Sequence, residues 1–229
     1  MDVDSTVNAI KSMEIRGAGR IARAGASALA NFAGSYEGDD SKGFMIDLMA
    51  AKAKILDSRP TAVSLWNGVH ATIRGVDDAY TLDDAIQTVI SNSEDFVKRS
   101  LGAVETIARI GAKRISDGDT IMTHCNSSAA LGVIKEAHRQ GKDIRVFATE
   151  SRPWRQGILT VNDLAKAGVD VTMIIDSAVR TVMRRTDKVF VGADTITSHG
   201  ALINKVGTSQ LALAANEARV QFYVCSETY

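Results

Sequence analysis

Cysteine and proline are scarce in this sequence of 229 residues. Only two cysteines occur, Cys125 and Cys225, and their spacing fits neither a zinc-binding pattern nor a disulfide framework. This usage is typical of a reducing compartment, so we expect a cytoplasmic protein. The two prolines, Pro60 and Pro153, each follow an arginine.

Net charge and long apolar runs are also missing. The 27 Lys and Arg residues balance 27 Asp and Glu residues, so no general field attracts nucleic acid or a membrane surface. Any anionic ligand must therefore be held by local groups. No apolar run approaches the about 18 residues that span a bilayer, and the N-terminal MDVDSTVNAI lacks the features of a signal peptide. We expect a soluble protein with no nucleic-acid or membrane partner.

The first half of the chain has the apolar periodicity of helices. With 45% hydrophobic residues the chain can bury an ample core. Between residues 82 and 115 apolar side chains recur at steps of three and four, which predicts one long helix with a buried face. The helices predicted in this half are Val3–Ser12, Arg20–Phe32, Lys42–Asp57, Thr61–Ile73 and Leu82–Ile115.

After Gly118 the pattern changes to short apolar runs that alternate with helical segments. The predicted strands are Asp119–Thr123, Ile144–Ala148, Val169–Ile175, Lys188–Val191 and Gln221–Cys225, with helices at Ser128–Gln140, Ile158–Ala167, Ser177–Met183 and Thr208–Ala218. Such alternation is typical of a doubly wound parallel sheet. The sequence thus predicts an α/β protein: a helical N-terminal domain at residues 1–117 and a Rossmann-like domain at 118–229.

Ligands of such sheets bind beyond the carboxyl ends of the strands, where helix N-termini present free N–H groups. This rule selects the residues that follow each of the first four predicted strands. They are His124 to Ser127, Glu150 to Arg152, Asp176 and Ser177, and Gly192 to Asp194. We expect all four groups at one rim of the sheet.

Cys125 lies at that rim, beside the start of a helix, where the helix dipole favours a thiolate. It is either a usable base or a small buried hydrophobe, since free cysteines are among the most buried residues. Its neighbours Asn126, Ser127 and Ser128 either cap the helix or bind an oxyanion.

Asp194 ends the apolar run VFVGADTI and is either a loop or capping residue, or an acid. In an apolar setting its carboxyl would hold a proton at neutral pH and could donate it. Together with Cys125 it would form an acid–base pair on one rim.

Several other residues are suited to phosphate. Arg16, Gly17, Ala18, Gly19 and Arg20 combine guanidinium groups with open backbone, and Arg59 and Arg152 precede the two prolines. Asn204 and Lys205 precede the last predicted helix and could reach the rim. RGAG follows no strand, so it is not a dinucleotide fingerprint and can be a simple turn. His124 is expected to be structural and His199-Gly200 to be a loop.

Taken together, these segments resemble the isomerase branch of the translation initiation factor 2B related family, and within it the archaeal ribose-1,5-bisphosphate isomerases. The similar segments are IRGAGRIARAGASAL, SRPTAV, THCNSSAA, ESRPWRQG, GADTI and INKVGTSQLALAA. They span nearly the whole chain in order. The family chain normally continues past this point with a further phosphate-binding lysine, so we expect that the C-terminal end of the domain is not included here.

The resemblance implies that Cys125 is the catalytic thiol and Asp194 its carboxyl partner. It implies substrate contacts at Arg16, Gly17, Ala18, Gly19, Arg59, Asn126, Ser127, Ser128, Arg152, Asn204 and Lys205. The implied substrate is a phosphorylated pentose, ribose 1,5-bisphosphate, converted to ribulose 1,5-bisphosphate in AMP breakdown. It implies no metal and no cofactor, a homo-oligomer that is a dimer or a hexamer, and activation by AMP.

Two other interpretations stay open. A methylthioribose-1-phosphate isomerase of methionine salvage would use a similar pair, but it needs an apolar pocket where a second phosphate needs cations. Arg16, Arg20 and Arg59 favour the bisphosphate. A non-catalytic regulatory subunit of the initiation factor 2B type would lack the paired cysteine and aspartate.

Overall fold

The computed structural model describes residues 1–228, which form two compact units, Met1–Gly102 and Ala103–Thr228. The division falls inside one continuous helix, α5. The two units are divided by compactness, whereas the boundary predicted at 117/118 marks a change in sequence pattern. That boundary stays a prediction.

The first unit is helical. Its elements are α1 (Val3–Lys11), α2 (Ala18–Gly34), α3 (Ser41–Asp57), α4 (Val63–Thr72), the short 3-10 helix η1 (Val76–Asp78) and the first part of α5 (Leu82–Ala112). Side chains cap several starts: Asp2 accepts from the N–H of Ser5, and Asp40 accepts from that of Gly43. At α5, Thr81 Oγ1 accepts the N–H of Asp84 and donates to its carboxylate.

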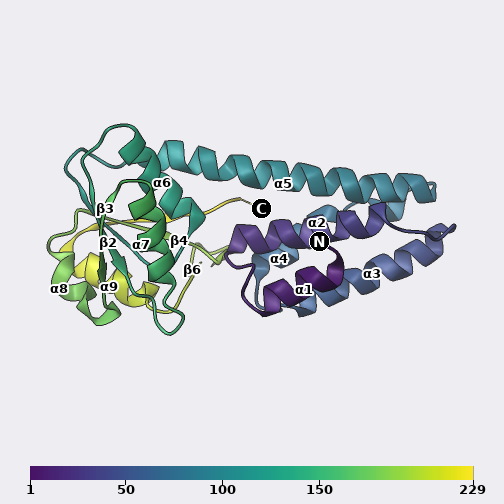
Figure 1. Ribbon diagram of the computed structural model, residues 1–229, viewed down its shortest axis with the longest axis horizontal. Coiled ribbons are helices and arrows are strands. Elements are labelled where there is room, and N and C mark those ends of the chain that lie inside the picture. Colours follow the sequence, from purple (N-terminus) through teal and green to yellow (C-terminus); the bar gives the residue numbers. More distant parts are fainter. Residues whose placement is uncertain (229) are drawn as a thin grey trace. The chain divides into compact units, whose positions relative to one another are not determined.

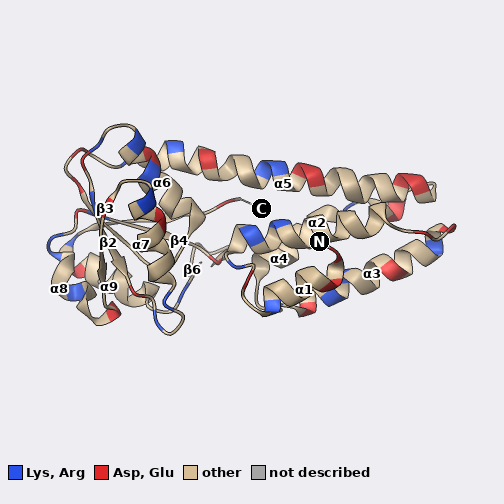
Figure 2. Ribbon diagram, viewed as in Figure 1, with Lys and Arg blue, Asp and Glu red and all other residues tan. Residues whose placement is uncertain are grey.

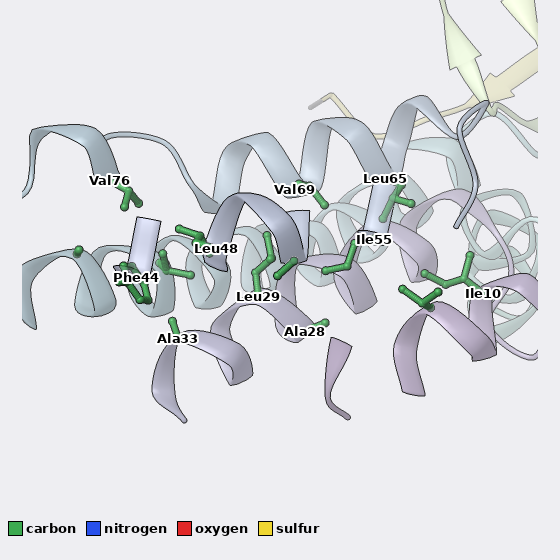
Figure 3. Close-up of a cluster of buried hydrophobic side chains, with 14 of the residues drawn as sticks. Ile10, Ala28, Leu29, Ala33, Phe44, Leu48, Ile55, Leu65, Val69 and Val76 are labelled. Carbon is green, nitrogen blue, oxygen red and sulfur yellow. The ribbon is translucent and has the colours of Figure 1, made fainter. Parts of the chain in front are cut away.

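The core of this unit collects apolar side chains from all of its α-helices. Figure 3 shows Leu29 of α2, Phe44 and Ile55 of α3 and Leu65 of α4 gathered in this cluster, and each of the four is fully buried. Burial of such side chains stabilises a fold by about 1.5–3 kcal/mol each. The helical periodicity of the sequence is thus converted into one shared core.

The second unit contains a five-stranded parallel sheet with the order β3-β2-β1-β4-β7. Its strands are β1 (Thr120–Thr123), β2 (Arg145–Thr149), β3 (Asp170–Ile174), β4 (Lys188–Gly192) and β7 (Gln221–Cys225). Its helices are α6 (Ser128–Arg139), α7 (Gln156–Lys166), the 3-10 helix η2 (Asp176–Ala178), α8 (Val179–Met183) and α9 (Thr208–Ala218). The predicted α/β class with a parallel sheet is confirmed.

Helices cover both faces of this sheet, as Figure 1 shows. Ile121 of β1 and Phe190 of β4 pack with α6, α7 and the last turns of α5 on one face. On the other face, Met122, which follows Ile121, and Val189, which precedes Phe190, pack with α8 and α9. Successive residues of a strand point to opposite faces, so near-continuous apolar strands serve two cores.

One small element was not predicted from the sequence. β5 (Thr195–Ile196) and β6 (Leu202–Ile203) pair antiparallel and form a hairpin between β4 and α9. The Thr197–Gly200 backbone hydrogen bond closes its turn, which agrees with the loop expected at His199-Gly200. Two-residue strands are too short to produce a sequence pattern.

Several element ends also differ from the prediction. α2 begins at Ala18 instead of Arg20, and α7 begins at Gln156 instead of Ile158. α5 ends at Ala112, three residues before its predicted end. Glycine in the first turns of α2 and α7 hid the true starts, because glycine lowers helix propensity.

Charges of both signs are interspersed along α5 (Figure 2). Such mixing agrees with the formal net charge of zero. No helix within residues 1–228 combines the length and the apolar character that a bilayer crossing requires.

Candidate active site

The direction of chain progression across the sheet changes between β1 and β4. From β1 the chain moves to β2 and β3 on one side, while β4 lies on the other side of β1. Helices from the two faces diverge at such a point and leave a crevice at the carboxyl ends of the strands. Cys125 follows β1 and Asp194 follows β4, so the two residues predicted as a pair leave adjacent strands at this crevice.

Cys125 has a left-handed backbone conformation, with φ 67°. This conformation is uncommon for a residue with a Cβ and needs support from its surroundings. The support comes from two buried hydroxyls. Ser151 Oγ accepts the N–H of Cys125 at 2.8 Å, and Thr160 Oγ1 donates to its carbonyl at 2.6 Å.

The thiol of Cys125 is half-buried and donates to Gln156 Oε1, with 3.0 Å between sulfur and oxygen. Burial raises its pKa above the ordinary value, because a thiolate is poorly solvated there. The backbone N–H of Asn126 and the positive charge of Lys205 lower the pKa, and the negative charge of Asp194 raises it. Lys205 and Asp194 are thus close enough to act on the sulfur.

His124 is buried beneath the rim. Its Nε2 lies 2.8 Å from the carbonyl oxygen of Val206, and its Nδ1 lies 2.6 Å from Thr149 Oγ1. A carbonyl can only accept, so Nε2 carries the proton. Burial lowers the pKa of the ring below its usual value. A neutral imidazole tied to a backbone carbonyl agrees with the structural role expected from the sequence.

Asp194 begins the hairpin that the sequence did not reveal. Its N–H donates to the carbonyl of Ile203 at 3.0 Å, so the residues after β6, Asn204 and Lys205, return to the same rim. Asn204 Nδ2 donates to Thr208 Oγ1, and the carbonyl of Lys205 accepts from that hydroxyl. Asp194 itself is exposed, so the apolar setting expected around its carboxyl is not found among the described residues.

The turn after Cys125 leads directly into α6. Ser127 is the N-cap and accepts the N–H of Ala130 at 3.3 Å, while Ser128 is exposed and Asn126 Nδ2 donates to Thr160 Oγ1. A Cβ at Gly192 would overlap Ser127 Oγ, so only glycine fits at the end of β4. That close approach keeps the turn after β1 against the end of β4.

Arg152 lies on the other side of the crevice, after β2. Its side chain is exposed, and its N–H donates to a carboxylate oxygen of Asp176 at 2.8 Å. The second oxygen of Asp176 accepts the N–H of Ser151 at 2.9 Å. Glu150 pairs with Arg155 at 3.1 Å. The ends of β2 and β3 are therefore tied together, and the Arg152 guanidinium reaches solvent.

The remaining predicted binding residues belong to the first unit. Gly17 is the N-cap of α2 with φ 87°, and no side chain caps that helix. Ala18 and Gly19 form its first turn, where backbone N–H groups lack helical acceptors. Arg16 and Arg59 are half-buried, and Arg59 Nη1 donates to Met13 Sδ at 3.1 Å. These are groups of the kinds that bind anions, and their phosphate contacts stay a prediction.

Three residues around Cys125 received no role from the sequence: Ser151, Gln156 and Thr160. All three are buried, and each bonds a different polar group of Cys125. The strand-end rule had placed Ser151 at the rim, and the motif ESRPWRQG contains both Ser151 and Gln156, but nothing in the sequence pointed to their contacts with Cys125. Among residues 1–228 no group of three or more His, Cys, Asp or Glu side chains could hold a metal ion.

Comparison with known proteins assigns the chain to a family. The sequence profile of the initiation factor 2 subunit family matches residues 14–229. The chain is 48% identical over 227 residues to the ribose 1,5-bisphosphate isomerase of Methanocaldococcus jannaschii, a match that covers 99% of this chain and 72% of that protein.

Solved structures of similar fold include proteins of different titles. The translation initiation factor eIF-2B of Pyrococcus horikoshii OT3 superposes with a TM-score of 0.89 and 31% identity, covering 99% of this chain and 78% of that one. The 5-methylthioribose 1-phosphate isomerase of the same organism gives a TM-score of 0.86 and 28% identity, covering 97% and 66%.

Proposed function

Because the chain belongs to the initiation factor 2 subunit family, we propose that it is an isomerase that converts ribose 1,5-bisphosphate to ribulose 1,5-bisphosphate. The observation that carries the proposal is the placement of Cys125 and Asp194 at the ends of adjacent strands, where the carboxylate charge acts on the thiol. The printed name of the relative at 48% identity supports this choice of substrate.

In the proposed reaction the Cys125 thiolate removes the proton from C2 of the sugar. The C2–H electron pair forms a C1=C2 double bond, the bond between C1 and the ring oxygen breaks, and Asp194 gives its proton to that oxygen. The product of this step is an open-chain enol phosphate. Its C2 hydroxyl returns a proton to Asp194, the Cys125 thiol gives a proton to C1, and the ketone forms with both groups restored.

Each group faces a physical requirement in this cycle. The raised pKa of Cys125 means that the thiol predominates at neutral pH, so the rate should rise with pH as thiolate forms. Lys205 favours the thiolate, which gives it a role beyond phosphate binding. Asp194 is exposed in the free chain, so proton donation requires that the bound sugar exclude water from its carboxyl.

Phosphate binding is proposed for groups in both units. In the first unit these are Arg16, the open N-terminus of α2 at Gly17, Ala18 and Gly19, and Arg59. In the second unit they are Arg152, Lys205, Asn204 and the turn of Asn126, Ser127 and Ser128. Guanidinium forks and helix N-termini are well suited to phosphate oxygens. We propose no metal or cofactor for this proton transfer.

The proposal is tested by the variants Cys125→Ser and Asp194→Asn in an assay of ribulose 1,5-bisphosphate formation. Positioned acid–base groups contribute about 100-fold or more, so each variant should lose at least that factor. Activity within about threefold of the parent in either variant refutes the role assigned to that residue. Thermal unfolding of both variants checks that the loss is chemical.

Two alternative functions are separated by the same assay. Faster turnover of methylthioribose 1-phosphate than of ribose 1,5-bisphosphate would favour a methylthioribose-1-phosphate isomerase. A parent protein inactive on both sugars would favour a regulatory subunit. Running the assay with and without AMP, and measuring the mass in solution, tests the proposed activation and the proposed dimer or hexamer.

A further inference from the structure

One short segment, residues 149–160, holds every polar group of Cys125. Ser151 accepts its N–H, Thr160 donates to its carbonyl, and Gln156 accepts its S–H. The first two bonds fix the backbone of a residue in a costly conformation. The third reaches the sulfur itself, so it bears directly on the proton that the thiol must lose.

Gln156 is fixed in position by its surroundings. It is the first residue of α7, its side chain is 7% exposed, and Gly157 packs so closely on β2 that a Cβ there would overlap the carbonyl oxygen of Thr149. The amide therefore stays beside the sulfur. Its freedom is mainly rotation about its last bond, which exchanges Oε1 and Nε2.

This rotation matters because the sulfur changes its hydrogen-bonding needs. A thiol donates and is satisfied by Oε1, whereas a thiolate can only accept and is satisfied by an N–H. An amide has both groups at nearly the same place, and a carboxylate or a thioether does not. Of the 20 amino acids only asparagine and glutamine carry a side-chain amide.

Other groups also act on the sulfur, among them the backbone N–H of Asn126, and the amide adds to their effect. Lys205 and Asp194 are the charged residues that act on the thiol, with opposite effects, and they lie in the segments after β6 and β4. Nearby, Glu150 and Arg155 pair with each other, and both Asp176 oxygens accept backbone N–H groups. The neighbouring His124 donates to a carbonyl and faces Thr149.

We propose that Gln156 is a positioning residue that hydrogen-bonds Cys125 in both protonation states, through Oε1 to the thiol and through Nε2 to the thiolate. As a statement about catalysis the inference rests on the proposed function. Its chemical core, the support of a thiolate by the amide, concerns the free protein and needs no substrate.

The test compares the parent with Gln156→Met and Gln156→Glu by the rate of iodoacetamide alkylation from pH 6 to pH 10. Methionine keeps the volume but cannot donate, so thiolate formation should be weaker and alkylation at pH 7.5 about tenfold slower. Glutamate keeps the shape but adds a like charge, so alkylation should be slower by about another tenfold. Over this range each profile should shift to higher pH in the same order.

Two outcomes overturn the proposal. If Gln156 serves only packing, Gln156→Met reacts at the parental rate, because methionine fills the same volume. The added charge slows Gln156→Glu in either case. If the amide only retains the thiol proton, the methionine variant reacts faster than the parent. Should Gln156→Glu fail to fold, the direction of change in Gln156→Met alone decides.

Controls separate this inference from the function. Cys125→Ser measures the background from Cys225, which is buried and whose pKa burial raises to about 12. If Gln156→Met is alkylated more slowly than the parent but the parent does not isomerise the bisphosphate, the inference stands and the proposed function is wrong. If the parent is an active isomerase but Gln156→Met is not slower, the function stands and the inference is wrong.

Discussion

The two ends of the parallel sheet are built on opposite principles. At the amino end, Asp119 and Lys188 form an ion pair whose side chains are 11% and 14% exposed. Asp119 also accepts the N–H of Ser116 at 2.6 Å. At the carboxyl end, Asp194 and Lys205 belong to no ion pair within 4.0 Å among the described residues.

The difference shows where a charge is satisfied by its own protein and where it is left for something else. In a buried ion pair each charge loses its hydration, and the attraction of its partner offsets that cost only in the folded state. A cation and a carboxylate beside a half-buried thiol are the groups to which we assign substrate contacts in the proposed function. The same sheet is thus closed at one end and open at the other, and the following variants test this contrast.

The largest effect on stability is expected for Asp119→Ala. This change leaves Lys188 buried without its partner and should lower the free energy of unfolding by about 3–5 kcal/mol, measured by urea denaturation. The control is Asp170→Ala, because Asp170 pairs with Arg145 at 3.6 Å on the exposed surface of the same sheet end. It should cost at most about 1 kcal/mol. Equal costs in the two variants would contradict the assigned burial.

Asp194→Asn should show the reverse profile in the same urea experiment. The side chain is exposed, and the hydrogen bond of this residue to Ile203 uses the backbone, so unfolding should change by no more than about 0.5 kcal/mol. Isomerase activity should still fall about 100-fold. A stability loss comparable with that of Asp119→Ala would mean that the open end is also structural.

Ser151→Ala tests a buried residue that contributes to the stability of the fold and also holds Cys125 in place. It removes the buried acceptor of the Cys125 N–H, so the free energy of unfolding should fall by about 1–3 kcal/mol. Because Cys125 loses support for its backbone, kcat should fall about tenfold while KM changes little. Ser198→Ala, in the exposed hairpin turn, is the matched control and should change neither quantity. An unchanged kcat in Ser151→Ala would remove the link between this hydroxyl and the thiol.

The smallest effect is a pH dependence of stability from His124. Its pKa is lowered in the folded state, so the unfolded chain takes up the proton first as pH falls. The stabilising contribution is present above about pH 6.5 and is lost below it, by no more than about 1.4 kcal/mol per pH unit. Urea unfolding from pH 7.5 to pH 5 should show a shallower slope for His124→Asn than for the parent. The variant His199→Asn should keep the parental slope.

The order of elements could be read from the sequence because their periods are long. The apolar repeat of residues 82–112 and the five short apolar runs each produced the expected helix or strand. The rim also followed, because parallel strands deliver the residues after them to one edge. This rule selected Cys125 and Asp194 from the sequence, whereas Lys205 was proposed from its place before the last predicted helix.

The partners of Cys125 could not be found by the same reasoning. Gln156 lies 31 positions from Cys125, and the pairing of β1 with β2 and the close packing of Gly157 on β2 help to bring them together. The exposure of Asp194 was also beyond reach, because an apolar strand before a carboxylate says nothing about what covers it. The β5–β6 hairpin, which returns Lys205 to the rim, has strands of two residues and no period to detect.

The backbone pairing of β1 with β4 has a consequence for redesign. Thr123 is in register with Phe190, so the segments that carry the thiol and the carboxyl start one strand spacing apart, about 4.8 Å. If the proposed function holds, loops at the crevice can be exchanged while the strand ends that carry Cys125 and Asp194 keep their positions. A library restricted to residues 152–155 and 197–201 would change only residues after the strand ends and would keep the Ser151 hydroxyl that holds Cys125.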